Sequence, residues 1–485
     1  MKKINYVVFI TMVVFNFYYV AQTRHLSDIK NEVANTNYKE VRIKEIPMAM
    51  QCWTFRKLSF METLEKVNKL GIKFLEAFPG QRLYKNNDKK KFGVGMSEDD
   101  IKKVKQALNK YGITLRAFGV TNFENNETAA RKTFDFVKKM GIKVLVLEPK
   151  YDDYSIIDKM VKEYNIKVGI HNHPKPSKYW NPETALKNIE GLDKRIGICG
   201  DTGHWTRSGI KPVEALRLLK GRVMNIHLKD LDQFGVKKAK DVPFGTGKSN
   251  IHDILAELTL QNYCGTLSVE HERDDEQPDP SKSIAKGLKY IKSITYYNGY
   301  EQILRCDDNG FNKHGWNHYG PGYFELDKTT GVITSSGGMG LFWYSAKKYG
   351  NFILDLEFKC LAPETNSGVF IRVPKMLTSN EYIHHSFEVQ IDDDNPEAIH
   401  RTGAVYDAEP VKINAVKPTG EWNHYKITVI NKNIKVELNG KLVNDWNEEP
   451  RGKIKDFSLS GFIGLQNHDS SAKVSFRNIY IKELK

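Results

Sequence analysis

Cysteine is scarce in this sequence of 485 residues, which has five cysteines and no Cys-x-x-Cys pair. An odd number of cysteines without such pairs excludes a disulfide scaffold and a zinc ribbon. Cys52, Cys199 and Cys264 lie in apolar runs of strand character. These runs predict that the three side chains are buried free thiols.

Several other signatures are also missing. Hydrophobic residues make up 40% and charged residues 27% of the chain, which excludes a collagen, a generally disordered chain and a multi-span membrane protein. The net charge is +14, but the longest basic cluster is only Lys89 to Lys91. We interpret the excess as a solvated basic surface and expect no nucleic-acid partner, because no nucleic-acid module is recognisable.

Nucleotide-binding loops are absent too. Gly247-Lys248-Ser249 resembles the end of a phosphate-binding P-loop, but Val242 stands where the pattern requires glycine. No G-x-G-x-x-G follows a predicted strand, so we expect no bound nicotinamide cofactor.

A long apolar run occurs at the N-terminus. Lys2 and Lys3 precede an apolar stretch from Ile4 to Ala21, which is the pattern of a secretory signal peptide over residues 1–22. The alternative is an uncleaved anchor, since the stretch approaches the roughly 20 residues of a spanning helix. In both cases we expect a periplasmic or secreted protein, with membrane contact only through this segment. Residues 23–45 are polar, and we expect a loose lead-in.

A helix–strand unit then repeats from residue 46 to 298. Amphipathic helical stretches end at Gly or Asn, where the backbone requires a left-handed residue, and continuous apolar strands follow, as expected for buried parallel strands. The predicted strands are 46–53, 71–78, 113–120, 141–148, 166–172, 195–200, 222–228 and 263–270. Eight strands alternating with helices predict a (β/α)8 TIM barrel. A doubly wound sheet is the rival fold, but it gives no reason for a count of eight.

Acid and imidazole side chains follow five consecutive predicted strands. Chemistry in such barrels lies at the C-terminal ends of the strands. Three carboxylates and one imidazole suit one divalent ion such as Mn, Mg, Co or Zn. The proposed metal ligands are Glu148, Asp201, His227 and Glu270. Each alone could be a salt-bridged loop residue; the convergence of all four favours a metal site.

Further polar residues accompany this set. His171 and His173 follow the fifth strand, where substrate binding and structural hydrogen bonding are both open. His204 and Lys229 follow the sixth and seventh strands, and we expect them to bind substrate or support the ligands. For the proton-abstracting base we consider Glu148, Glu270 and His173.

These residues carry a resemblance to a known family. The stretches are Glu148-Pro149, His171-Asn172-His173-Pro174, Asp201-Thr202-Gly203-His204-Trp205, His227-Leu228-Lys229-Asp230, Gly245-Thr246-Gly247 and Ser268-Val269-Glu270. In this order they resemble the xylose-isomerase-like, sugar phosphate isomerase/epimerase barrel family. The resemblance implies metal ligands at Glu148, Asp201, His227 and Glu270. The family includes isomerases, epimerases, inosose dehydratases and endonucleases, and the chain resembles the endonuclease branch less.

The pattern changes in residues 299–485. Phe352, Leu354, Leu356 and Phe358 alternate with polar residues, and Asn439-Gly440 predicts a hairpin turn. Many short strands with Gly, Pro and Asn turns predict an all-β jelly-roll sandwich.

One strand of this region has polar residues on one face. Glu388 and Gln390 alternate with apolar residues, and Arg372 lies on another apolar strand. Tyr406 could stack on a sugar ring. The alternative is that all four are ordinary surface or core residues.

The second region also resembles a family. The stretches are Asn366-Ser367-Gly368-Val369-Phe370-Ile371-Arg372, Phe387-Glu388-Val389-Gln390-Ile391-Asp392, Thr402-Gly403-Ala404-Val405-Tyr406, Gly420-Glu421-Trp422-Asn423, Gly464-Leu465-Gln466 and Phe476-Arg477-Asn478-Ile479. They resemble the 3-keto-disaccharide hydrolase family, a concanavalin-like sandwich. The resemblance implies an acid/base role for Glu388 and sugar binding by Arg372, Gln390 and Tyr406.

Together the two regions predict an exported, metal-dependent enzyme that cleaves 3-keto glycosides. The barrel would remove the C2 proton and eliminate the aglycone, and the sandwich would act as a hydrolase or hydratase. The alternatives are a sugar isomerase or epimerase with a carbohydrate-binding sandwich, and a non-catalytic sugar-binding protein. The sequence leaves the sugar, the aglycone, the metal and the oligomeric state open.

Overall fold

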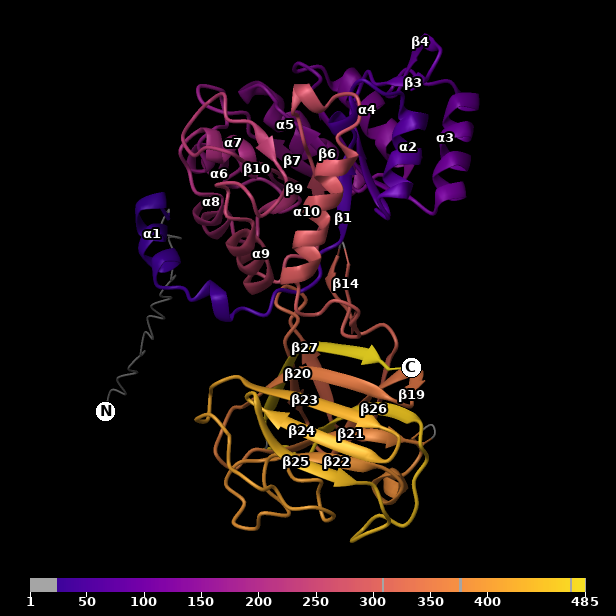
Figure 1. Ribbon diagram of the computed structural model, residues 1–485, viewed down its shortest axis with the longest axis vertical. Helices are drawn as coiled ribbons and strands as arrows, with labels where there is room; N and C mark the ends of the chain where they lie inside the picture. Colours follow the sequence, from indigo (N-terminus) through magenta and orange to yellow (C-terminus); the bar gives the residue numbers. More distant parts are fainter. Residues whose placement is uncertain (1–23, 308, 375–376, 472, 485) are drawn as a thin grey trace, which may run out of the picture.

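The computed structural model describes residues 24–307, 309–374, 377–471 and 473–484. The predicted signal peptide, residues 1–22, lies outside the described residues. Two domains lie end to end, with the barrel at the top and the sandwich at the bottom of Figure 1. Among the described residues, the helices are all too short or too polar to cross a membrane.

The first domain is a closed barrel of eight parallel strands in the order β1-β12-β9-β8-β7-β6-β5-β2. The strands are β1 (Met48–Gln51), β2 (Phe74–Ala77), β5 (Thr114–Thr121), β6 (Val144–Leu147), β7 (Lys167–His171), β8 (Ile196–Asp201), β9 (Val223–Leu228) and β12 (Leu267–Val269). All eight fall within or overlap the predicted ranges, so the predicted barrel is confirmed. The exact domain boundaries stay a prediction.

The helices pack outside the strands. They are α2 (Phe60–Lys69), α3 (Glu98–Tyr111), α4 (Glu127–Met140), α5 (Tyr154–Tyr164), α6 (Pro182–Asn188), α7 (Thr202–Arg207), α8 (Pro212–Leu218), α9 (Ile251–Leu260) and α10 (Ser281–Ile294). The predicted stop residues end their helices as expected: Gly112 and Asn165 adopt φ of 60° and 56° after α3 and α5. Most of the apolar core lies between the strands and these helices.

The predicted loose lead-in is instead ordered where the structure describes it. Helix α1 (Leu26–Ala34) packs against α8 and buries Ile29 completely. Tyr38 follows it, and its hydroxyl lies 2.6 Å from Glu257 Oε2 in α9. Because the segment is mostly polar, its sequence did not indicate that Ile29 and Tyr38 are buried and attach it to the barrel.

The second domain is a sandwich of two antiparallel sheets, as predicted. One sheet contains β17 (Tyr323–Leu326), β18 (Ile333–Ser336), β27 (Val474–Glu483), β20 (Phe352–Cys360), β23 (Asn423–Ile430), β24 (Asn433–Leu438) and β25 (Lys441–Asn447), with β13 (Glu301–Gln302) beside β27. The other has the order β16 (Trp316–Tyr319), β19 (Gly340–Tyr349), β26 (Gly461–Asn467), β21 (Asn366–Val373), β22 (Phe387–Asp392). The apolar core lies between the sheets.

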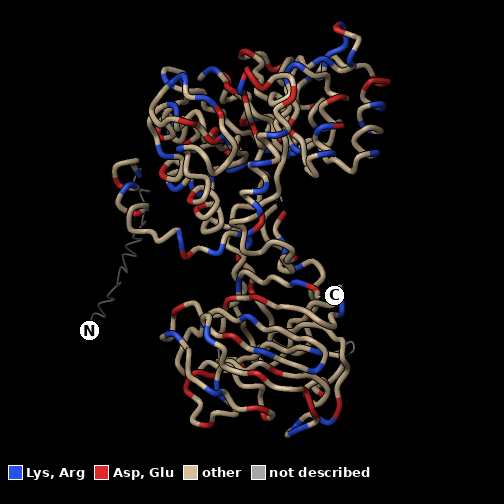
Figure 2. Tube along the Cα trace, viewed as in Figure 1, with Lys and Arg blue, Asp and Glu red and all other residues tan. Residues whose placement is uncertain are grey.

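Shorter strands complete the chain. They form three two-stranded pairs: β3 (Arg82–Tyr84) with β4 (Asn87–Lys91), β10 (Asp230–Leu231) with β11 (Asp241–Val242), and β14 (Cys306–Asp307) with β15 (Gly310–Phe311). Lys and Arg are interspersed with Asp and Glu over both domains (Figure 2), in agreement with a dispersed basic excess.

A disulfide joins the two domains. Cys264, just before β12, is bonded to Cys306 in β14, with their Cα atoms 5.7 Å apart. The prediction of a free thiol at Cys264 is therefore wrong. The sandwich docks on the barrel and brings Cys306, which lies 42 residues later in the sequence, next to Cys264. Cys52 and Cys199 are free and buried as predicted.

Packed side chains fix the same junction. The ring of Tyr297, after α10, stacks on Tyr480 of β27 with 3.8 Å between centroids. Its hydroxyl lies 2.9 Å from Asp355 Oδ1 in β20. The two domains are therefore held together by a covalent bond and by buried side-chain contacts.

Candidate active sites in the barrel and the sandwich

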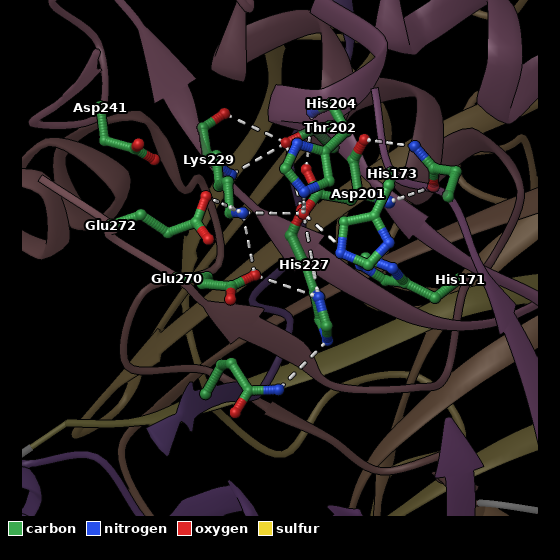
Figure 3. Close-up of polar contacts among 12 residues, drawn as sticks. His171, His173, Asp201, Thr202, His204, His227, Lys229, Asp241, Glu270 and Glu272 are labelled. Carbon is green, nitrogen blue, oxygen red and sulfur yellow. Dashed lines mark hydrogen bonds and ion pairs between the residues drawn. The ribbon is translucent and has the colours of Figure 1, made fainter. Parts of the chain in front are cut away.

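Three of the four predicted ligands converge at the C-terminal rim of the barrel (Figure 3). The ring nitrogen Nδ1 of His227 lies 3.1 Å from Glu270 Oε2 and 3.9 Å from Asp201 Oδ2. All three side chains are buried, and their ligand atoms lie within 4.8 Å of one another. They come from the ends of β8, β9 and β12, as the strand-end argument requires.

Glu148 lies in a neighbouring cluster. Its Oε2 atom lies 2.5 Å from Nδ1 of His173, and His171 completes the group. His171 connects the two clusters, because its Nε2 lies 3.7 Å from Asp201 Oδ2. The hydrogen bond between Glu148 and His173 raises the pKa of His173 above its ordinary value. Glu148 and His173 therefore form an acid–base pair at the accessible edge of the site.

A buried lysine lies among the carboxylates. Nζ of Lys229 is 2.9 Å from Asp201 Oδ2, 3.1 Å from Glu270 Oε2 and 2.7 Å from Glu272 Oε2. Its side chain is 1% exposed. We predicted that Lys229 binds substrate or supports the ligands, and the structure places it where it neutralises the carboxylates. His204, predicted alongside it, has Nε2 at 3.5 Å from Asp201 Oδ2.

Glu76 is a candidate site residue that the sequence pattern did not indicate. It lies in β2, it is fully buried, and its Oε1 is 2.8 Å from His227 Nε2. Because an ionised carboxylate only accepts hydrogen bonds, Nε2 carries the proton and Nδ1 faces Asp201 and Glu270. A carboxylate behind a histidine is the usual support of a metal-ligating imidazole. The available signal was a charged residue inside the apolar run Phe74 to Phe78.

The residues present fit a divalent ion. Several buried atoms of this rim make no hydrogen bond with a described residue: His171 Nδ1 and Nε2, Asp201 Oδ2, His227 Nδ1 and Glu270 Oε2. Asp201 Oδ2 and Glu270 Oε2 instead have the ion-pair contacts with Lys229 and His227 given above. Unsatisfied buried polar atoms are costly, and a cation held by Asp201, His227 and Glu270 would satisfy several at once. Carboxylate oxygens with one imidazole suit Mn, Mg, Co or Zn.

The cluster opens into a cavity of about 390 Å³. Its walls include Glu148, His173 and the aromatic side chains of Trp53 and Phe78, whose rings meet edge to face with centroids 5.0 Å apart. The volume suits a small ligand such as a monosaccharide. Trp53 is 40% exposed, so it offers an apolar surface at the entrance.

We expect that replacing Glu76 by glutamine lowers the affinity for a divalent ion by roughly 10- to 100-fold, because the support of His227 is lost. Calorimetric titration of the metal-stripped protein with Mn²⁺ or Zn²⁺ measures this affinity. The exposed Glu65 of α2 provides the matched control, Glu65→Gln, which should leave affinity unchanged. An unchanged affinity in a folded Glu76→Gln variant would remove Glu76 from the site.

The sandwich has a second buried polar group. Glu388 and Gln390 in β22 are 3% and 1% exposed, and they lie on the face opposite the core residues of the same strand. Oε2 of Glu388 accepts a hydrogen bond from Nζ of Lys453 at 2.9 Å. A Cβ atom at Gly368 would lie 2.3 Å from Glu388 Oε1, so glycine is needed for this carboxylate position.

Tyr406 belongs to this group. Nζ of Lys453 lies 3.9 Å from the centroid of its ring, and its backbone N–H donates to the Glu388 carbonyl at 2.9 Å. Burial raises the pKa of Glu388, against the opposing effect of Lys453. Oε1 of Gln390 and of Gln466 are buried and have no hydrogen-bond partner in the described part of the chain. The amide oxygens of Gln390 and Gln466 are therefore available to accept hydrogen bonds from a ligand, and the pKa of the Glu388 carboxyl group is raised.

Arg372 does not join the sandwich group, contrary to its predicted role in sugar binding. Its guanidinium is fully buried and donates to Glu448, at 3.0 Å, and to the carbonyls of Gly350, Leu459 and Asn431. Its φ of 64° breaks the alternation of the strand. The side chain is therefore used inside the fold, where it cannot reach a sugar.

Comparisons with known proteins follow this division into two domains. A family model for a xylose isomerase-like TIM barrel matches residues 64–294, and one for a 3-keto-alpha-glucoside-1,2-lyase-like domain matches residues 306–482. An inosose dehydratase of Clostridium tetani is 27% identical over 248 residues, which are 40% of this chain and 80% of that protein.

Solved structures of similar chains include an uncharacterized protein from Parabacteroides distasonis. It is 30% identical and aligns over 51% of this chain and 98% of its own, with a TM-score of 0.43. The IOLI protein with a bound zinc atom is 16% identical over 52% of this chain and 98% of its own, with a TM-score of 0.43. From the two family models and the observed folds, the chain combines a xylose isomerase-like TIM barrel with a 3-keto-alpha-glucoside-1,2-lyase-like domain.

Proposed function

We propose that the protein is an exported enzyme that cleaves 3-keto glycosides, with elimination of the aglycone in the barrel. The observation that carries the proposal is the buried Asp201–His227–Glu270 cluster, whose His227 and Glu270 line the same cavity as the Glu148–His173 pair. A ketone at C3 makes the C2–H acidic, so a positioned base and nearby positive charge are the groups that such a reaction requires.

The barrel residues would act as follows. Glu148, ionised beside His173, or His173 itself takes the C2 proton, and the electron pair of the C–H bond forms the C1=C2 double bond. The C1–O bond breaks, and a proton from the surrounding acids goes to the departing aglycone oxygen. A divalent ion held by Asp201, His227 and Glu270 would supply Lewis acidity to the carbonyl. Lys229 adds fixed positive charge beside the same carboxylates.

The sandwich would complete the hydrolysis by adding water to the product of elimination. Glu388 would act as acid or base, since burial raises its pKa above the ordinary glutamate value and Lys453 donates a hydrogen bond to its carboxylate. Gln390 and Tyr406 would bind sugar hydroxyls or stack on the ring. In this reading the aglycone leaves at C1, and water later restores a hydroxyl at the same carbon.

The names of related proteins support elimination chemistry in both domains. A dehydratase removes water by elimination, and the family model of the sandwich is described as 1,2-lyase-like. The latter description makes the sandwich the alternative location of the aglycone elimination. Variants in each domain distinguish the two placements.

A second candidate function is sugar isomerisation or epimerisation with a sandwich that only binds carbohydrate. The match of the barrel to a xylose isomerase-like model favours it. The same proton abstraction would then be followed by reprotonation rather than by loss of a group. The experiment is product analysis by NMR after incubation with a 3-keto glucoside: a released aglycone supports elimination, and an isomer that keeps all substrate atoms supports the alternative.

Export is the remaining part of the proposal. The Cys264–Cys306 disulfide supports it, because disulfides persist in oxidising compartments such as the periplasm. The basic and apolar residues 1–22 support it independently.

A further inference from the structure

A second cavity, of about 620 Å³, lies at the opposite end of the barrel from the metal cluster. Met48, Phe74 and Leu267 line it, and each is the first residue of its barrel strand. Asn298, Tyr300 and Gln302 after α10, and Tyr480 of β27, line it from the side of the sandwich. The cavity therefore belongs to the junction of the two domains and not to the rim at which Asp201, His227 and Glu270 converge.

Lys44 is a buried cation in the wall of this junction cavity. It is 5% exposed. Its backbone N–H donates to Thr259 Oγ1 at 3.2 Å, but its ammonium group has no hydrogen bond or ion pair with any residue that the structure describes. Lysines are almost never buried to this extent unless they are paired. Burial without a counter-ion lowers the pKa of Lys44 to about 7.

Gln302 provides a second unmet donor in the lining of this cavity. It lines the cavity, and its buried amide nitrogen has no hydrogen-bond partner within the described ranges. Lys44 and Gln302 therefore both offer N–H groups, and such donors are satisfied by an acceptor such as a carboxylate.

The remaining walls are mainly aliphatic, with Ile46, Ile72, Leu288 and Ile291 among them. The other titratable groups that line the cavity are Glu45, Lys73, Lys292, Tyr300 and Tyr480. The lining therefore contains one carboxylate, Glu45, and three lysines, Lys44, Lys73 and Lys292. The surroundings thus combine apolar surface with an excess of positive charge.

We propose that the junction cavity binds a small amphipathic carboxylate, with its carboxylate at Lys44 and Gln302 and its apolar body against the aliphatic walls. A bound carboxylate supplies the counter-ion that Lys44 lacks, so it favours the protonated amine. Binding above neutral pH is therefore coupled to proton uptake. Because both domains line the cavity, the ligand also contacts both sides of their junction.

The test uses the full-length protein and octanoate in isothermal titration calorimetry. Titrations at pH 8 in buffers with different ionisation enthalpies should show uptake of about one proton per octanoate, and titrations at pH 6 almost none, because Lys44 is already protonated there. 1-Octanol, which has the same chain and no charge, should bind at least about tenfold more weakly, since it lacks the charged hydrogen bond.

Lys44→Met should weaken octanoate binding about tenfold or more and remove the proton uptake, without weakening 1-octanol binding. Lys102→Met, on the exposed face of α3, is the matched control and should behave as the unaltered protein. The proton uptake of the unaltered protein tests the proposal even if Lys44→Met does not fold. Absence of octanoate binding, equal binding of octanol, or unchanged binding in Lys44→Met would overturn it.

Discussion

Asp201→Asn is expected to slow aglycone release from a 3-keto glucoside by about a thousandfold and to lower the bound metal well below one ion per chain. Asp201 connects the cluster, since its Oδ2 faces His171, His204, His227 and Lys229. Metal ions contribute several kcal/mol to stabilising developing charge, and about 1.4 kcal/mol corresponds to a factor of ten in rate. Rate measurements and metal analysis of the purified variant check both effects.

The control for this variant is Asp274→Asn, which makes the same chemical change at a carboxylate that is 87% exposed. It should keep the rate and the metal content of the unaltered protein. Circular dichroism establishes that both variants fold. A folded Asp201→Asn variant with normal metal content and a normal rate would show that the barrel cluster is not the catalytic metal site.

Glu388→Gln is expected to reduce the sandwich step by about 10² to 10⁴, the usual contribution of a general acid or base. In the proposed division of labour, this variant still releases the aglycone and accumulates the product of elimination. The two steps are separated by following the aglycone optically and the sugar product by NMR. Glu381→Gln, at a carboxylate whose side chain is 58% exposed, is the matched control.

Three results of the Glu388→Gln experiment are informative. Loss of water addition alone supports the proposal. Loss of aglycone release places the elimination in the sandwich. Unchanged rates with weaker sugar binding make the sandwich a binding module.

Glu388 also gives a pH signature. Because burial raises its pKa, the folded protein holds this proton more tightly than the unfolded chain does. The free energy of unfolding therefore falls as pH rises from the ordinary glutamate pKa through the folded-state value. Glu388→Gln should flatten this part of the stability profile.

The fold could be predicted from the sequence because its periodicities are local. Buried parallel strands are apolar along their whole length, and stop residues such as Gly112 and Asn165 mark the helix ends. Because the C-terminal ends of the barrel strands meet on one rim, the proximity of Asp201, His227 and Glu270 could also be predicted. These predictions needed no knowledge of distances between segments.

The missed features depend on contacts between distant segments. Glu76 points inward from the middle of β2, so the strand-end rule passes over it, and its partner His227 is 151 residues away. Lys453 meets Glu388 from a loop without periodicity. The Cys264–Cys306 bond forms only because the sandwich docks on the barrel. Arg372 is a local exception, because its positive φ interrupts the regular alternation of side chains along β21.

The most direct measurement compares a 3-keto glucoside that carries a chromogenic aglycone with the unoxidised glucoside, each with and without a chelator. The account predicts release of the aglycone from the keto form alone, and loss of that release when the chelator removes the metal. Release from the keto form that survives chelation would contradict elimination at a barrel metal site. Absence of release from the metal-loaded protein would contradict the cleavage of this glycoside altogether.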